Sequence, residues 1–301
     1  MTMRIFSHYA LLLAALPLLA ASCNKAQEVA ADRSPVTFTV AGEGISVDVE
    51  TKAAEVTAAN LSPINVLAIT GTAGSAETTA WSGAFADNGE GQYTATAADR
   101  FWPSEGNPGW MFYASNVSMT PAATGPTVAA DNSTDVVCSF MGSPAPRSSN
   151  TLVFEHILAR INDVTVNAAA GYTITNVVIT VTPLISGTFN LAAGIGHTDG
   201  TGWSATVPGA STTISRDDQL PGVKNNDVWC VPGNYVITAA WTATKGESVQ
   251  NYSGKTQTVA ITGGKQNNLV TTLGGNASEV VFSVTVNPWG TVDVPVAFPT
   301  D

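Results

Sequence analysis

Charged residues are scarce in this chain of 301 residues: 12 are Lys or Arg, 23 are Asp or Glu, and the charged fraction is 12%. Soluble domains usually carry about 25% charged residues. The net charge of -11 argues against nucleic-acid binding, because an acidic protein without a basic stripe repels phosphate groups. The scarcity of Glu, Lys and Arg also disfavours long helices. A hydrophobic fraction of 44% nevertheless predicts a folded chain, since disordered segments are low in hydrophobicity.

The apolar run near the N-terminus is too short to cross a membrane. It covers Tyr9–Ala21, whereas a membrane-spanning helix needs about 20 residues, and its length is typical of a signal peptide. The small residues before Cys23 resemble a lipobox, which predicts removal of residues 1–22 by cleavage after Ser22 and acylation of the cysteine. A plain secretory signal with an incidental cysteine is the alternative. Residues 23–35 are mostly small and polar, as expected for a tether.

Cysteine and histidine are rare, with three residues of each. Cys138 and Cys230 remain after removal of the signal and the anchor cysteine, and two cysteines without a CxxC spacing make no zinc site. Each lies in an apolar run, so they form either a disulfide or two buried free thiols. His156 also lies in an apolar run, which favours a buried structural role, whereas the Gly-rich surroundings of His197 favour exposure.

Motifs of the common catalytic and metal sites are missing. The sequence has no HExxH, GxSxG or EF-hand loop. The segment Ser253–Thr256 resembles the end of a phosphate-binding loop, but Val249 stands where that motif requires glycine. We therefore expect no catalytic site, no metal and no cofactor. An enzyme that uses His156 or His197 is the alternative, since catalytic triads assemble across a fold.

Short runs of Val, Ile, Thr and aromatic residues, separated by Gly, Pro, Asn and Asp, are the main pattern of the chain. This pattern is typical of an all-β sandwich. The expected strands are Val36–Val40, Ile45–Glu50, Ile64–Ile69, Gln92–Ala97, Trp110–Ala114, Val136–Phe140, Leu152–Val166, Tyr172–Thr182, Tyr235–Thr244, Thr256–Thr262, Asn268–Leu273 and Val280–Val286. The segment Tyr235–Thr244 alternates with period two, which places one face in a core and the other toward solvent.

The segment Met141–Asn150 is rich in Pro and Ser and is the best linker in the chain. This composition prevents sheet pairing and is typical of a domain boundary. We therefore expect an N-terminal domain over residues 36–147 and a C-terminal domain over residues 148–301.

Aromatic residues are concentrated between Phe101 and Tyr113. Exposed aromatic rings stack on sugars, so Trp102, Trp110 and Tyr113 form a candidate glycan platform. A place in the core is the other interpretation, because aromatic side chains carry a large apolar area. The platform would make the protein a monomeric surface lipoprotein that binds glycans.

Several features recur together in a particular order along the chain. They are Cys23, Thr51–Ala53, Trp102–Pro103, Trp110–Ala114, Leu152–Ile161, Val231–Gly233, Gly263–Lys265 and Val286–Trp289. In this order they make the chain similar to the fimbrillin-like subunits, the pilins with which Gram-negative anaerobes build fimbriae by donor-strand exchange (type V pili).

The resemblance implies two transthyretin-like β-sandwich domains in tandem, after a lipoprotein signal peptide, and a non-catalytic structural role. It implies attachment to the outer membrane through the acylated Cys23 and display at the cell surface in a fimbrium that serves adhesion. The implied partners are other fimbrial subunits, the outer-membrane lipid, and a ligand on a host or bacterial surface.

In such pilins a trypsin-like protease cuts after a basic residue near the N-terminus, and a strand of a neighbouring subunit fills the groove left by the released strand. The matching candidates here are the bond between Lys52 and Ala53 and, less well placed, Arg33. A cut after Lys52 would release both strands expected before it; a solvated loop lysine is the alternative. The partly alternating segment Thr291–Pro299 is the candidate donor strand, or a final edge strand of its own domain.

Overall fold

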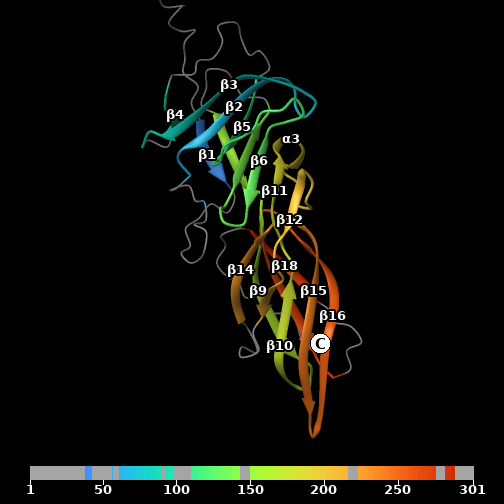
Figure 1. The fold of residues 1–301 in the computed structure, drawn as a ribbon. Helices are drawn as coiled ribbons and strands as arrows, with labels where there is room; N and C mark the ends of the chain where they lie inside the picture. Colours follow the sequence, from blue (N-terminus) through green and yellow to red (C-terminus); the bar gives the residue numbers. More distant parts are fainter. Residues whose placement is uncertain are drawn as a thin grey trace, which may run out of the picture.

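The computed structural model describes residues 38–42, 56, 61–89, 92–97, 110–142, 150–215, 223–275 and 282–288. Most of them lie in β-strands, so the predicted all-β class is confirmed. The strands form an elongated molecule, with one group in the upper part of Figure 1 and another in the lower part. In the described part of the chain, no helix is long and apolar enough to span a membrane.

Seven strands in the N-terminal part close into a barrel, in the order β1-β4-β3-β2-β5-β7-β8. Their bounds are β1 Phe38–Gly42, β2 Ile64–Thr72, β3 Ala76–Asp87, β4 Tyr93–Ala95, β5 Met111–Ser115, β7 Val137–Met141 and β8 Asn150–His156. The neighbours pair antiparallel except for β1 and β8, which run parallel. Closure gives every barrel strand a hydrogen-bonded neighbour on both sides, which removes exposed edges.

A three-stranded sheet packs against one side of the barrel. Its order is β12-β11-β6, and its elements are β6 Thr127–Asp131, β11 Leu184–Asn190 and β12 Trp203–Pro208, with the short helix α3 Leu191–Gly194 after β11. The sheet therefore joins strands from both sides of the expected boundary at residues 147 and 148. Strand β8 also follows that boundary, and it closes the barrel. The division into residues 36–147 and 148–301 stays a prediction.

Two four-stranded sheets form the C-terminal part, in the orders β13-β10-β15-β16 and β14-β9-β17-β18. Their bounds are β9 Ala159–Ala168, β10 Thr173–Val181, β13 Thr212–Ser215, β14 Val223–Cys230, β15 Gly233–Lys245, β16 Ser248–Ile261, β17 Lys265–Leu273 and β18 Phe282–Pro288. Ile179, Ile237 and Trp241 of the first sheet share one core with Val164 and Leu269 of the second. Two sheets that pack on a shared core make a β-sandwich.

Strands β2 and β5 are buried on both faces. Val66 and Phe112 point into the barrel, whereas Leu67, Ile69 and Tyr113 pack in the layer shared with the three-stranded sheet. A strand with two buried faces has a nearly continuous apolar run. This accounts for the apolar segments that predicted these two strands.

Strand β15 has one buried face, as its alternating sequence predicts. Tyr235, Ile237 and Trp241 are buried, whereas Val236 is 56% exposed. Strands with one solvated face show this period of two.

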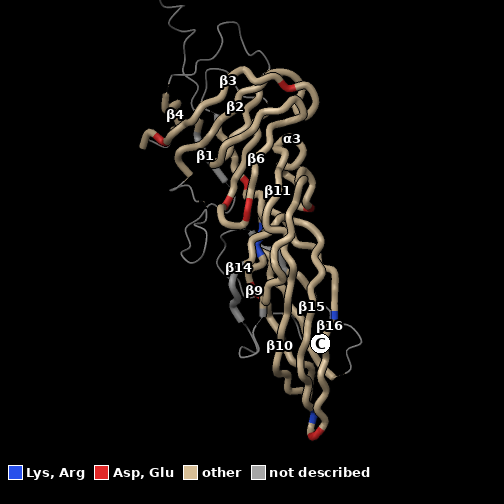
Figure 2. The backbone as a smooth tube through the Cα atoms, in the orientation of Figure 1, with Lys and Arg blue, Asp and Glu red and all other residues tan. Residues whose placement is uncertain are grey.

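Charges are few along the described trace, as Figure 2 shows. The described Lys and Arg residues all lie at position 160 or beyond: Arg160, Lys224, Lys245, Lys255 and Lys265. The described part of residues 38–142 carries Glu77, Asp87, Asp131 and Asp135 but no Lys or Arg. The barrel side of the molecule is therefore acidic in its described residues.

Candidate functional site

Strand β1 occupies an interior position in the barrel, between β4 and β8. Its five residues pair in parallel with β8, from Phe38 opposite Asn150 to Gly42 opposite Phe154. Phe38 also pairs with Tyr93 of β4. Because both neighbours direct backbone groups at β1, its absence would leave unpaired donors and acceptors on two sides.

The side chain of Phe38 anchors β1 through its contacts with other aromatic rings. It is fully buried, and its ring centroid lies 5.3 Å from that of Phe85 and 5.1 Å from that of Phe112, with interplanar angles of 66° and 76°. Such edge-to-face contacts are favoured by the charge distribution of aromatic rings. Burial of a Phe side chain contributes about 1.5–3 kcal/mol, so Phe38 is a strong anchor for a short strand.

A buried carboxylate holds the chain just beyond the expected cleavage bond. The backbone N–H of Val56 donates to Asp135 Oδ2 at 2.7 Å, and His156 Nδ1 lies 3.0 Å from Asp135 Oδ1. Asn116 Nδ2 donates to the carbonyl oxygen of Asp135 at 2.8 Å. Asp135 is 1% exposed and His156 is 5% exposed, so the expectation of a buried His156 is confirmed. A buried polar group with several partners rigidifies its surroundings, and the Asp135 anchor ties Val56 to the end of β8.

Asp135 is not among the functional residues that the sequence predicts. Its signal is an acidic residue directly before the apolar run Val136–Cys138. Carboxylates are almost never fully buried unless they are paired, so an acid at the start of a buried strand indicates partners elsewhere in the fold. Which partners these are depends on contacts between Asp135, Val56 and His156 that sequence spacing does not reveal.

The two cysteines are free thiols, and the disulfide alternative is wrong for this structure. Cys138 lies in the layer between the barrel and the three-stranded sheet, whereas Cys230 lies in the core of the C-terminal sandwich. Burial raises the pKa of each thiol to about 12. Thiols with so high a pKa are poor nucleophiles at neutral pH.

The glycan platform is contradicted at Tyr113. This side chain is fully buried; its hydroxyl donates to Glu77 Oε1 at 2.8 Å, and its ring stacks on Phe140 at 4.8 Å. Trp110 is partly buried and packs edge-on against Trp81 and Phe112. The strand needs these aromatic rings for packing, so the core interpretation is confirmed for Tyr113.

Among the described residues, no group of three or more His, Cys, Asp and Glu side chains is placed to hold a metal ion. His197 is exposed in the loop after α3, as predicted. His156 and His197 therefore occupy different environments, one buried and one open to solvent.

Several predicted functional residues lie outside the described residues. They are Ser22, Cys23, Arg33, Lys52, Ala53, Trp102 and the segment Thr291–Pro299. Their roles in lipidation, cleavage, ligand binding and strand donation stay predictions.

No family model matches the chain, and no curated protein matches its sequence. Among solved structures, the fold is similar to a fimbrial protein from Bacteroides vulgatus, with a TM-score of 0.53 and 12% identity, covering 84% of this chain and 99% of the other. It is also similar to a protein from Parabacteroides distasonis that is named for cell adhesion, with a TM-score of 0.51 and 12% identity, covering 88% of this chain and 99% of the other. At the level of the fold, these similarities confirm the resemblance to fimbrillin-like proteins that the sequence predicts.

Proposed function

We propose that the chain is a non-catalytic structural subunit of a fimbrium, in which the position of β1 is emptied by proteolysis and refilled by a strand of another subunit. The proposal rests on the position of β1 inside a closed sheet, between β4 and β8. A strand in this position connects to both neighbours through backbone hydrogen bonds. An incoming strand can restore both sets of bonds by β-augmentation.

The proposed cleavage lies between Lys52 and Ala53, and it would separate β1 from the rest of the barrel. The buried slot would then expose the rings of Phe85 and Phe112, which Phe38 covers. Burying such apolar surface again favours occupation of the slot by another strand. The Asp135 anchor at Val56 would keep the new N-terminal segment attached to the barrel.

Two further parts of the proposal concern delivery and assembly. Acylation of Cys23 would attach the precursor to the outer membrane, since several acyl chains on one residue suffice for stable anchoring. The C-terminal segment Thr291–Pro299 would supply the incoming strand. The fimbrium would serve adhesion through a ligand on a host or bacterial surface.

Limited proteolysis with a trypsin-like enzyme tests the proposal. We expect N-terminal sequencing to find a product that begins at Ala53, and concentrated product to form ladders that resist SDS. The variant Lys52→Gln is the control, and it should keep its N-terminal strand and stay monomeric. A product that begins at Ala53 and remains monomeric at high concentration would contradict strand exchange.

A further inference from the structure

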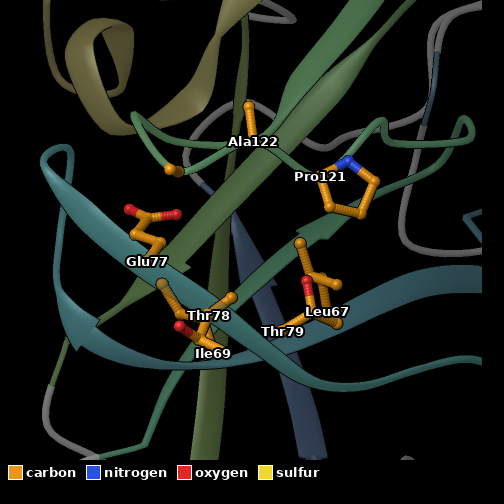
Figure 3. Close-up of a pocket in the computed structure, with 8 residues that line it drawn as sticks. Leu67, Ile69, Glu77, Thr78, Thr79, Pro121 and Ala122 are labelled. Carbon is orange, nitrogen blue, oxygen red and sulfur yellow. The ribbon is translucent and has the colours of Figure 1, made fainter.

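A second feature of the barrel side is a pocket of about 290 Å³ beside the hairpin of β2 and β3. Its floor consists of the buried residues Leu67, Ile69 and Glu77. Its rim consists of exposed residues from β3 and from the loop before β6, namely Thr78, Thr79, Pro121, Ala122 and Ala123. Figure 3 shows Glu77 rising from its strand toward the loop that carries Pro121 and Ala122.

The loop that forms the rim is held by segments far away in the sequence. Glu77 donates its backbone N–H to the carbonyl oxygen of Ala123 at 3.0 Å. Asn190 Nδ2 donates to the carbonyl oxygen of Thr124 at 3.0 Å, and the N–H of Leu191 donates to the carbonyl oxygen of Pro126 at 2.9 Å. The pocket is thus a built part of the fold, supported from both β3 and the end of β11.

Glu77 is 91% buried, since its exposed fraction is 9%, but its two carboxylate oxygens differ. Oε1 accepts hydrogen bonds from the N–H of Gly74 at 2.7 Å and from the hydroxyl of Tyr113 at 2.8 Å. Oε2 is buried and accepts no hydrogen bond from any described residue. A buried acceptor without a donor is costly, which indicates that a ligand or solvent group completes this site.

Tyr113 stays a hydrogen-bond donor to Glu77 over the whole neutral range. Burial, then the hydrogen bond to Glu77 and the negative charge of Glu77, raise the pKa of Tyr113 far above its usual value of 10.0. The negative charge of Glu77 has no Lys or Arg beside it within the described part of residues 38–142. Figure 2 shows the same absence of blue segments on the described trace around the β2–β3 hairpin.

We propose that this pocket binds a primary ammonium group on an unbranched alkyl stem, with the ammonium at Glu77 Oε2 and the stem along Leu67, Ile69 and Pro121. A cation provides both the missing donor and the opposite charge, and charge-assisted hydrogen bonds are stronger than neutral ones. The apolar floor suits methylene groups, as in the stems of lysine side chains that lie along apolar surface.

The size of the pocket further restricts which ligands can bind. Small-molecule sites measure about 300–1,000 Å³, so this pocket is at the lower limit and suits one side chain or one small amine rather than an oligosaccharide. A lysine side chain of another protein and a free alkylamine share this chemistry.

A titration followed by NMR of the isotope-labelled chain tests the proposal with three probes. They are n-butylammonium, the uncharged n-butanol, and Nα-acetyl-lysine-N-methylamide. We expect the ammonium probes to shift the amide signals of Glu77 and Thr78 with saturation, and butanol to leave them unchanged. Equal binding of both ammonium probes supports a lysine side chain as the natural ligand, whereas binding of n-butylammonium alone supports a free amine.

Two variants separate the role of the charge from that of the fold. Glu77→Gln keeps the size of the side chain, and we expect it to weaken binding by about tenfold or more. Ala122→Phe places a large ring at the rim of the pocket while keeping Glu77, and it should also prevent binding. Glu247→Gln, at an exposed turn, is the matched control and should bind as the unmodified chain does. Absence of saturable shifts in the unmodified chain, or equal binding by folded Glu77→Gln, would overturn the proposal.

Discussion

The first and last described strands, β1 and β18, are held in different ways. Strand β1 lies inside a closed sheet, between β4 and β8. Among the described strands, β18 lies at the edge of its sheet and pairs antiparallel only with β17, from Phe282 opposite Thr271 to Pro288 opposite Lys265. Gln257 of β16 adds a side-chain clamp, because it accepts from the N–H of Phe282 and donates to its carbonyl oxygen.

The difference shows which strand position suits exchange. Removal of β18 would expose one edge of a sheet, whereas removal of β1 would open a slot with backbone groups on both sides. A replacement strand in that slot gains two sets of hydrogen bonds and covers the contacts of Phe38. We therefore infer that the interior position, rather than the edge, is the one used for assembly.

The largest loss of stability should follow removal of the aromatic ring of Phe38 in β1. We predict that Phe38→Ala lowers the free energy of unfolding by about 3–5 kcal/mol, because it creates a cavity between Phe85 and Phe112. Denaturant unfolding measures the change. The control is Val153→Ala on the neighbouring strand, where the side chain is 54% exposed and the cost should stay within about 0.5 kcal/mol. If the two variants lowered the free energy of unfolding equally, Phe38 would not be the residue that anchors β1.

A smaller effect should follow disruption of the Asp135 anchor. We predict that Asp135→Asn costs about 1–3 kcal/mol, because it replaces one of the two acceptor oxygens that face the N–H of Val56 and Nδ1 of His156 with an amide donor and removes the carboxylate. Hydrogen exchange at the amide of Val56 should speed up. Asp87→Asn, at an exposed position, is the control and should leave that amide protected. Unchanged protection in Asp135→Asn would show that Val56 is held by other contacts.

The clamp on β18 should have a weaker and more local effect. We predict that Gln257→Ala costs about 0.5–1.5 kcal/mol, the usual contribution of an intramolecular hydrogen bond. Exchange should speed up at the amide of Phe282 and stay unchanged in β1 and β8. Thr258→Ala, at an exposed position on the same strand, is the control. Faster exchange in β1 as well would mean that the two strands are not held independently.

The smallest effect on stability at neutral pH is expected from the buried thiols of Cys138 and Cys230. Their pKa is raised by burial from the usual 9.0 to about 12. In the unfolded chain the thiols ionise near pH 9, whereas in the folded chain they stay protonated. The stability that the two protonated thiols contribute to the folded chain is therefore fully present below pH 9, and it is lost as the pH rises toward 12. A thiol reagent at pH 8 should label neither Cys138 nor Cys230 until denaturant is added; labelling of either residue in the native protein would contradict its burial.

The sequence predicted the strands whose side chains have a clear pattern. Strands β2 and β5 have apolar runs, and β15 alternates, because burial selects their residues. Strand β12 was not predicted, since most of its residues are exposed and burial imposes no period on them. Strand β3 was missed for a related reason, since only Glu77 and Phe85 of this strand are buried.

The candidate site was predictable in part. A strand at Val36–Val40 followed from local composition, and it overlaps β1. Its parallel pairing with β8 and the link from Val56 to Asp135 join distant segments, so no local spacing encodes them. The same holds for the pocket at Glu77, whose rim is held by Asn190 from the other half of the chain.

Hydrogen exchange at the amides of β4 and β8 tests most directly whether another strand replaces β1. The amides should be measured in the intact chain, in the product cut after Lys52 at low concentration, and in the assembled product. We predict protection in the first, loss of protection in the second, and restored protection in the third, while β17 remains protected throughout. Assembly without a loss and recovery of protection in β4 and β8 would contradict the central claim that the position of β1 is the site of strand exchange.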